Sequence, residues 1–305
     1  MLPYVVQRVR GAAVVAFGVA AVIFVLLHLS GDPVAMLVPS DAPPEVFDST
    51  RRALGLDRPL PEQFVRYIAR VAAGDLGTSI RYNRPVAGLI AERLPRTFEL
   101  TVAALALAVA LALPAGIVSA LRRGTLVDRV TMLGAIAGQA VPIFWLALML
   151  IWLFGVNLRW LPVFGYGTAW HLVLPAVSLA TIVVGRLARL VRSSMLEVLG
   201  QDYVRTARAK GLPERAVVAR HALKNAAIPI VTLIGLQLGQ LLGGAVVTET
   251  VFAWPGLGVL AAEAVFNRDF PIVQGITLIV SLIFVLTNLL VDLLYVALNP
   301  RVRLE

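Results

Sequence analysis

The chain alternates long apolar runs with short breaks that are polar and mostly basic. A helix crosses the hydrocarbon core of a bilayer with roughly 20 apolar residues. The runs that meet this length cover about residues 9–29, 98–121, 130–155, 171–192, 226–249 and 272–298. Pro114, Pro142 and Pro175 fall inside such runs and predict local kinks. The pattern therefore predicts an all-α polytopic membrane protein with six transmembrane helices.

The composition agrees with a bilayer as the solvent. Hydrophobic residues make up 59% of the chain and charged residues only 15%, which soluble domains of this size rarely show. The net charge of +9 is typical of basic cytoplasmic loops in membrane proteins, so we expect no nucleic-acid partner. The chain has no Cys, and its three His are too far apart for zinc-ligand spacing, so no metal site is predicted.

Residues 1–29 allow two interpretations. Arg8 and Arg10 precede an apolar run, as they would in a signal peptide. The run is longer than a usual signal-peptide core, and His28 and Ser30 make a poor cleavage site. We therefore expect an uncleaved first span, with the signal peptide as the alternative.

The distribution of Lys and Arg predicts the orientation. With a cytoplasmic N-terminus, the inside segments carry most of these cations, and each short outside loop carries one, Arg159 or Arg268. Both termini are then cytoplasmic, and residues 30–97 form an external insert with two short amphipathic helices punctuated by Pro and Gly. The insert is either a solvated cap or a docking or gating surface. The predicted parts are residues 1–29, the insert 30–97 and a core 98–305.

The basic break at 193–225 has the plan of a helical hairpin. Its first half, about 193–210, has a helical pattern in which Asp202 can serve as an N-cap. Gly211 fits the C′ position after this helix, which often needs a left-handed backbone, and Pro213 is well placed to start a second helix.

Small residues near the turn give this hairpin a second property. Ala207 and Ala209 would let a short helix sit shallowly in a groove of another protein. The alternative is a basic loop that only enforces topology.

The fifth and sixth runs contain the polar residues of the membrane interior. Gly235, Gly239 and Gly243 share a helix face and favour close helix packing. Gln237 and Gln240 either form interhelical hydrogen bonds or line a polar path.

Charged and aromatic residues near the span ends are further candidates for that path. Asp292 should face the protein interior, where it can form a polar cluster with Asn288. Glu249 could pair with a basic residue of the insert or contact cargo. The loop at 252–271 is apolar yet external, and its Trp254 suits the aromatic belt at the membrane interface.

Several sequence blocks resemble one known family. "DYVRTARAKGL" followed by "RHALKNAAIP" resembles the cytoplasmic signature loop of bacterial ABC importer permeases, and it is most similar to the B-type subunit of the dipeptide/oligopeptide/nickel family. The Glu of the general importer signature is absent here, as in the peptide-permease variant. The other matching blocks are "GDP" at 31–33, "LGLDRPLPEQF" at 54–64, "GDLGTSI" at 74–80, "RLPRTFEL" at 93–100, "HLVLPA" at 171–176, "ETVFAWPGLG" at 249–258, "RDFP" at 268–271 and "NPRVR" at 299–303.

The resemblance implies a type I ABC importer permease fold in a bacterial inner membrane. The partners would be a second, C-type permease subunit, two ATPase subunits and an external substrate-binding protein. ATP and Mg²⁺ would be bound by the ATPases, since this chain has no phosphate-binding loop, so it is expected to be a non-catalytic subunit without a cofactor. The cargo would be dipeptides or oligopeptides, with nickel chelates or another small solute as the alternative.

The resemblance also assigns roles to residues. The segment from Asp202 to Gly211 would be the coupling helix that inserts into a cleft of an ATPase, and the loop 252–271 would be part of the outer gate or only an interfacial foot. The predicted coupling residues are Asp202, Tyr203, Arg205, Thr206, Ala207, Lys210, Gly211 and His221. The predicted path or gate residues are Gln237, Gln240, Glu249, Trp254, Asn288 and Asp292.

Two other classes of protein compete with this interpretation. A stand-alone channel or secondary transporter should show inverted repeats or broken helices with central charges, and the sequence shows neither. An intramembrane enzyme would need a paired nucleophile and base within the spans, and His28 and His171 lie near span ends with no suitable Ser.

Overall fold

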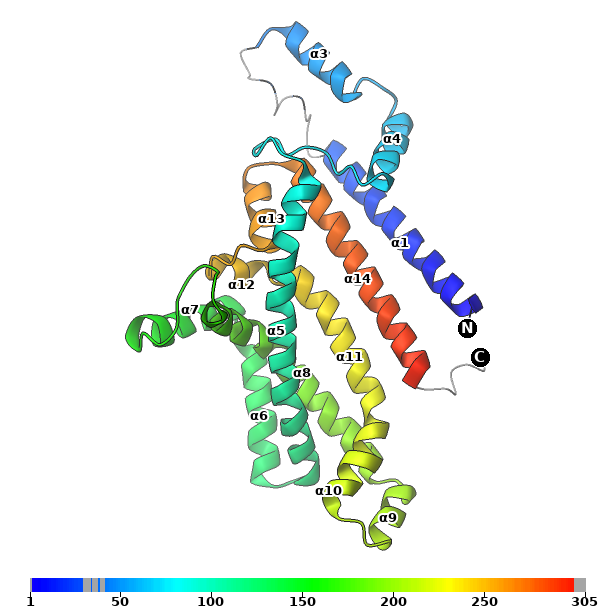
Figure 1. Cartoon of the computed structure of the whole chain (residues 1–305), viewed down its shortest axis with the longest axis vertical. Helices are drawn as coiled ribbons and strands as arrows, with labels where there is room; N and C mark the ends of the chain where they lie inside the picture. Colours follow the sequence, from blue (N-terminus) through cyan, green and yellow to red (C-terminus); the bar gives the residue numbers. More distant parts are fainter. Residues whose placement is uncertain (1, 30–33, 35–37, 39–41, 299–305) are drawn as a thin grey trace. The chain divides into compact units, whose positions relative to one another are not determined.

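The computed structural model describes residues 2–29, 34, 38 and 42–298, and the regular structure in this part of the chain is almost entirely helical (Figure 1). The elements are α1 (Leu2–Leu29), α3 (Pro44–Leu54), α4 (Leu60–Ala72), α5 (Val86–Leu121), α6 (Leu126–Ala140), α7 (Ile143–Leu150), η1 (Ile151–Asn157), α8 (Ala169–Leu199), α9 (Asp202–Ala209), α10 (Glu214–Ala216), η2 (Val217–Ala222), α11 (Leu223–Gly244), α12 (Val246–Val251), α13 (Leu257–Phe266) and α14 (Phe270–Leu298).

Four helical stretches of the described chain are long and apolar enough to cross a bilayer. They are α5, α8, the continuous stretch Glu214–Gly244 formed by α10, η2 and α11, and most of α14. In α1 the apolar stretch is shorter and covers Val9–Val25. The all-α membrane architecture is confirmed, and the count of six spans stays a prediction.

The third apolar run does not form one helix. It divides into α6 and the continuous pair α7–η1. Together these two parts are long and apolar enough for one span, but the chain bends by 100° between them. Pro142 precedes α7 and lies at this break, where a proline lacks the N–H needed to continue the helix. The predicted kink is therefore a full break here, whereas Pro114 and Pro175 lie inside the continuous helices α5 and α8.

The chain divides into two compact units. Unit 1 contains residues 95–259 and 286–298, and unit 2 contains residues 2–94 and 260–285, in both cases as far as the structure describes them. The predicted boundaries at residues 29 and 97 stay predictions.

Unit 1 is organised around α8. The residues Leu179, Val183 and Leu187 on this helix are fully buried in a core that α5, α6 and α11 complete. Glycines allow the close crossings: a Cβ on Gly116 of α5 would lie 2.6 Å from the Cβ of Val191, and a Cβ on Gly185 of α8 would collide with the α6 backbone. This small-residue packing is typical of membrane helices.

The last helix of unit 1 meets α11 at another glycine. A Cβ on Gly235 would collide with the side chain of Val291 on α14. The prediction that the glycines of the fifth span permit close helix approach is confirmed at this position.

Unit 2 joins the first helix to the insert. The ring of Phe24 on α1 lies 5.2 Å from that of Phe64 and 5.9 Å from that of Tyr67, both on α4. Buried Ala20 of α1 packs in one cluster with Leu278 from the first half of α14. One face of α4 therefore packs against apolar helices, and whether the insert is a solvated cap or a docking or gating surface stays a prediction.

A segment of unit 2 that we call the strap, residues 75–85, connects α4 to α5. It is fastened by the buried carboxylate of Asp269, whose Oδ2 accepts hydrogen bonds from Ser79 Oγ (2.5 Å) and Arg81 N (3.0 Å). Two of the sequence blocks, 74–80 and 268–271, thus meet in space.

Candidate functional site

The cytoplasmic hairpin predicted at 193–225 has three parts. Helix α8 continues to Leu199, the short helix α9 follows, and α10 and the π-helical η2 lead without a break into α11. Figure 1 shows α9 and α10 together at one end of α8 and α11. The two predicted halves are thus largely the ends of spanning helices, and α9 is the separate element between them.

The start of α9 differs from the prediction by one residue. The N-cap is Gln201, with φ −75° and ψ 149°, and Asp202 is the first helical residue. The prediction of Asp202 as the N-cap is therefore wrong. Its carboxylate still lies in the first turn, where negative charge suits the helix dipole, and it pairs with Arg205 at 3.2 Å.

The end of α9 follows the prediction. Gly211 has φ +77°, a left-handed conformation that glycine adopts at little cost. Its N–H donates to the carbonyl of Arg208 (2.9 Å), and the N–H of Leu212 donates to the carbonyl of Ala207 (3.4 Å). These two bonds form a Schellman motif, which fixes the direction of the chain after the helix.

One face of α9 is buried against the two longer helices. Val204 and Val217 are fully buried, Ala207 is 5% exposed, and all three pack with Val198 and Leu199. The prediction that small residues let the helix sit in a partner's groove is wrong for Ala207, whose side chain faces inward, and stays a prediction for the exposed Ala209. The small size of Ala207 instead allows α9 to approach the hairpin's own core.

The two arms of the hairpin are joined by a double hydrogen bond. Arg208 Nε and Nη2 donate to the two carboxylate oxygens of Glu214, at 3.1 and 2.7 Å. Both side chains are exposed, so the pair adds little stability. Its bidentate geometry nevertheless orients α9 relative to α10.

The outer face of α9 is polar and open to solvent. Its exposed residues include Asp202, Tyr203, Arg205, Thr206 and Lys210. Tyr203 is the aromatic member of this face, with 43% of its surface exposed.

His221 does not belong to this face. It lies partly buried on η2, in the other arm of the hairpin, and its carbonyl accepts a hydrogen bond from Asn225 Nδ2 (2.8 Å).

A second site surrounds the buried carboxylate of Glu249 in unit 1. Glu249 Oε1 accepts from Thr97 Oγ1 (2.7 Å), and Oε2 accepts from the backbone N–H groups of Gly258 (2.6 Å) and Val259 (3.2 Å). Thr97 Oγ1 in turn accepts from the N–H of Leu257 (2.7 Å). The carboxylate therefore satisfies the free N–H groups at the start of α13, as negative charge does at helix N-termini.

Two glycines make room for this carboxylate. A Cβ on Gly256 would collide with the Glu249 carboxyl group, and a Cβ on Gly258 would lie 2.6 Å from the Cα of Val246. The block "ETVFAWPGLG" is thus one structural unit in which the acid and its glycine-lined seat occur together.

Trp254 belongs to the same arrangement. It is 1% exposed, its Nε1 donates to the carbonyl of Arg96 (2.9 Å), and its ring lies edge-on to that of Tyr166 at 4.9 Å. The prediction that Trp254 lies in the interfacial belt is wrong, since the ring is inside the protein. Arg96, Thr97 and residues 249–258 therefore form one folded junction.

The other predicted path residues differ in their burial. Gln237 is buried on α11, whereas Gln240 is exposed on the same helix. Asn288 and Asp292 are partly buried on α14, and the buried Oδ1 of Asn288 has no hydrogen-bond partner among the described residues. A role for any of these residues in a path stays a prediction.

Sequence reasoning missed one buried ion pair in unit 1. Asp128 of α6 accepts two hydrogen bonds from Arg192 of α8, at 2.7 and 2.8 Å, and others from Ser119 Oγ and Gly124 N. The pair joins α8 to the turn between α5 and α6, seven residues before α8 ends. The position of Asp128 beside an apolar run is the one feature of the sequence that indicates a partner, but that partner, Arg192, is 64 residues away.

Comparisons with known proteins identify the family of the chain. The family described as "Binding-protein-dependent transport system inner membrane component" matches residues 112–304, and the model of its N-terminal region matches residues 1–101. The glutathione transport system permease protein GsiC of Pectobacterium atrosepticum is 45% identical over 304 residues, with 99% of each chain covered. GsiC of Escherichia coli strain K12 is 44% identical over the same length.

Solved structures support the fold. The methionine ABC transporter MetNI, in an inward facing conformation, aligns with a TM-score of 0.58 at 19% identity, covering 69% of this chain and 96% of that one. The chain belongs to the family of binding-protein-dependent transport system inner membrane components. It is a multi-pass permease of an ABC importer, and its resemblance to the peptide/nickel permeases is confirmed. In this family ATP hydrolysis belongs to partner subunits.

Proposed function

We propose that this chain is one of two unlike permease subunits of an importer for small peptides, and that α9 is its coupling helix. The proposal that α9 is the coupling helix is supported by the geometry of this helix. It is held by a buried apolar face, a Schellman turn at Gly211 and the Arg208–Glu214 pair, while its opposite face is open and polar. A short helix fixed on one side and free on the other is suited to transmit a displacement.

The partners in this proposal are a C-type permease subunit, two ATPases that bind ATP and Mg²⁺, and an external binding protein that delivers cargo. The hairpin and both termini lie on the cytoplasmic side of the inner membrane, as the excess of Lys and Arg in these segments favours. ATP binding closes the ATPase dimer, α9 moves with it, and the ends of α8 and α11 move because they share its core. The path then opens outward, and hydrolysis resets it.

The Glu249 junction supports the outer end of this mechanism. It fastens the start of α13 to α5 through Thr97 and to α12 through Glu249 itself. We propose that this junction holds part of the outer gate together, so Glu249 and Trp254 act by positioning and not by contact with cargo.

The cargo assignment depends on the relatives. Those at 44–45% identity are named for glutathione, which is itself a small peptide. Uptake of a labelled dipeptide, of glutathione and of a nickel chelate by the reconstituted importer decides between peptide and nickel cargo.

Replacing Gly211 by Val tests the coupling role. A side chain in this left-handed conformation costs about 1–3 kcal/mol, and a β-branched one is especially disfavoured. The strain redirects the chain between α9 and α10, while no atom blocks the added Cβ itself. We expect G211V to assemble normally but to lose transport and the stimulation of ATPase activity by loaded binding protein.

Gly200→Ala is the matched control. Gly200 lies at the other end of α9 with φ −80°, and its added Cβ would meet no atom closer than 3.6 Å. This variant should keep normal stimulation. Normal stimulation in G211V as well would refute the assignment of α9 as the coupling helix.

A further inference from the structure

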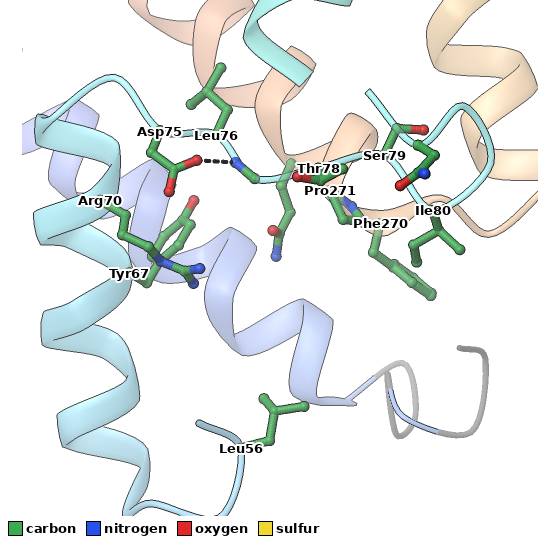
Figure 2. Close-up of a pocket in the computed structure, with 13 residues that line it drawn as sticks. Leu56, Tyr67, Arg70, Asp75, Leu76, Thr78, Ser79, Ile80, Phe270 and Pro271 are labelled. Atoms are coloured by element: carbon green, nitrogen blue, oxygen red, sulfur yellow. Dashed lines mark hydrogen bonds between the residues drawn. The ribbon is translucent and has the colours of Figure 1, made fainter. Parts of the chain in front are cut away.

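Unit 2 contains a cavity of about 490 Å³ between α4, the strap and the start of α14 (Figure 2). This volume lies within the range of small-molecule sites in proteins, which is roughly 300–1,000 Å³. Every residue that lines it belongs to this one unit. The walls are held in place by Asp269, which fastens the strap on one side.

Polar groups without protein partners converge on this cavity. Arg70 makes no ion pair, and neither the hydroxyl of Tyr67 nor the side-chain amide of Gln274 makes a hydrogen bond within the described parts of the chain. Burial raises the pKa of Tyr67, so its hydroxyl remains a hydrogen-bond donor at neutral pH. Three donors therefore face the same space without an acceptor among the residues that the structure describes.

The cavity also contains an acid and apolar walls. Asp75 uses Oδ1 to accept from the N–H of Gly77 (2.8 Å), which orients the carboxylate. Figure 2 shows Arg70 and Asp75 at one end of the cavity, and Ile80 and Phe270 toward the other. The site thus offers a cation, an anion and an apolar surface.

We propose that this cavity binds a small peptide through its free α-carboxylate and α-ammonium groups. Arg70 and the Tyr67 hydroxyl donate to the carboxylate, Asp75 accepts from the ammonium, and the apolar wall contacts the side chains. This inference rests on the proposed peptide cargo and extends it, because it places a cargo-class site between the predicted external insert and the start of α14.

Arg70→Gln tests this site in the complete importer, reconstituted in nanodiscs without its binding protein or nucleotide. The probe is the dipeptide alanyl-alanine, and binding is measured by isothermal titration calorimetry. Loss of a charge-assisted hydrogen bond should weaken binding about tenfold to a hundredfold. Arg66→Gln, one turn earlier on α4, is the control, because Arg66 lies outside the cavity and pairs with Glu62 at 3.4 Å.

A change in the ligand provides the second test. Alanyl-alanine amide, which lacks the carboxylate, should bind the unmodified importer as weakly as the dipeptide binds R70Q, and R70Q should show no further loss with the amide. Equal affinity of R70Q and the unmodified importer, or no binding to the unmodified importer, would overturn the proposal. Uptake of the dipeptide is measured separately: uptake without binding in the cavity rejects only this site, and absence of uptake rejects the proposed peptide cargo.

Discussion

Replacing Glu249 by Ala should lower the free energy of unfolding of unit 1 by about 3 kcal/mol or more and abolish transport. The substitution leaves two buried donors, Thr97 Oγ1 and the N–H group of Gly258, and the partly buried N–H group of Val259 without their acceptor. Each buried donor that loses its partner costs about 1–3 kcal/mol. The space left by the side chain adds to this loss. The midpoint of thermal unfolding of the purified complex measures the effect.

Two further variants make this result specific. Glu249→Gln keeps one oxygen that can accept from the N–H groups of α13, so its loss should be smaller than that of E249A. Thr250→Ala, at the next position, removes an exposed hydroxyl that bonds only within its own helix, and it should leave the midpoint unchanged. Equal stability of E249A and T250A would show that the junction does not hold α13 in place.

Replacing Asp128 by Ala is the second substitution with a large expected effect. It leaves the guanidinium of Arg192 without its carboxylate, and removing one partner of an ion pair destabilises a protein because the remaining charge is uncompensated. Arg192 retains some contact with solvent, which limits the loss. We expect a reduced unfolding midpoint and reduced amounts of the protein in membranes.

The double variant D128A/R192M separates the ion pair from general packing. Removing both charges removes the unpaired cation, so the double variant should be more stable than D128A alone. The double variant should still couple ATP hydrolysis to transport poorly, because the ion pair joins α8 to the turn between α5 and α6 close to the hairpin. A double variant less stable than D128A would show that the cation alone is not the source of the loss.

Local chemistry in the sequence predicted the features that depend on neighbouring residues. Four of the six apolar runs predicted long spanning helices, and the helix–Gly–Pro plan predicted the turn at Gly211, because backbone preference acts over a few residues. The N-cap of α9 lies one residue earlier than predicted, because Gln201 has extended backbone angles and Asp202 is already helical.

Features that depend on distant residues could not be predicted in this way. Glu249 and Thr97 are 152 positions apart, and Trp254 and Arg96 are 158 apart, so no local pattern indicates that they meet. The sequence alone predicts Trp254 at the membrane interface, because that is where an external Trp usually lies. The buried acceptor at Arg96 explains why it lies inside instead.

The direction in which Ala207 faces was also beyond local reasoning. Its position on the helix was predictable, but the neighbour it packs against, Val217, comes from the opposite arm of the hairpin. The exposed face of α9 therefore lies opposite Ala207 and includes Tyr203 and Thr206.

Site-directed cross-linking at Thr206 tests the central claim most directly. The chain contains no Cys, so a Thr206→Cys variant carries a single thiol, on the exposed face of α9. If α9 is the coupling helix, this thiol forms a cross-link with an ATPase subunit of the assembled importer, and a membrane-impermeant maleimide added to intact cells leaves it unlabelled. Labelling of the thiol from outside the cell, with no cross-link to an ATPase, would contradict the account.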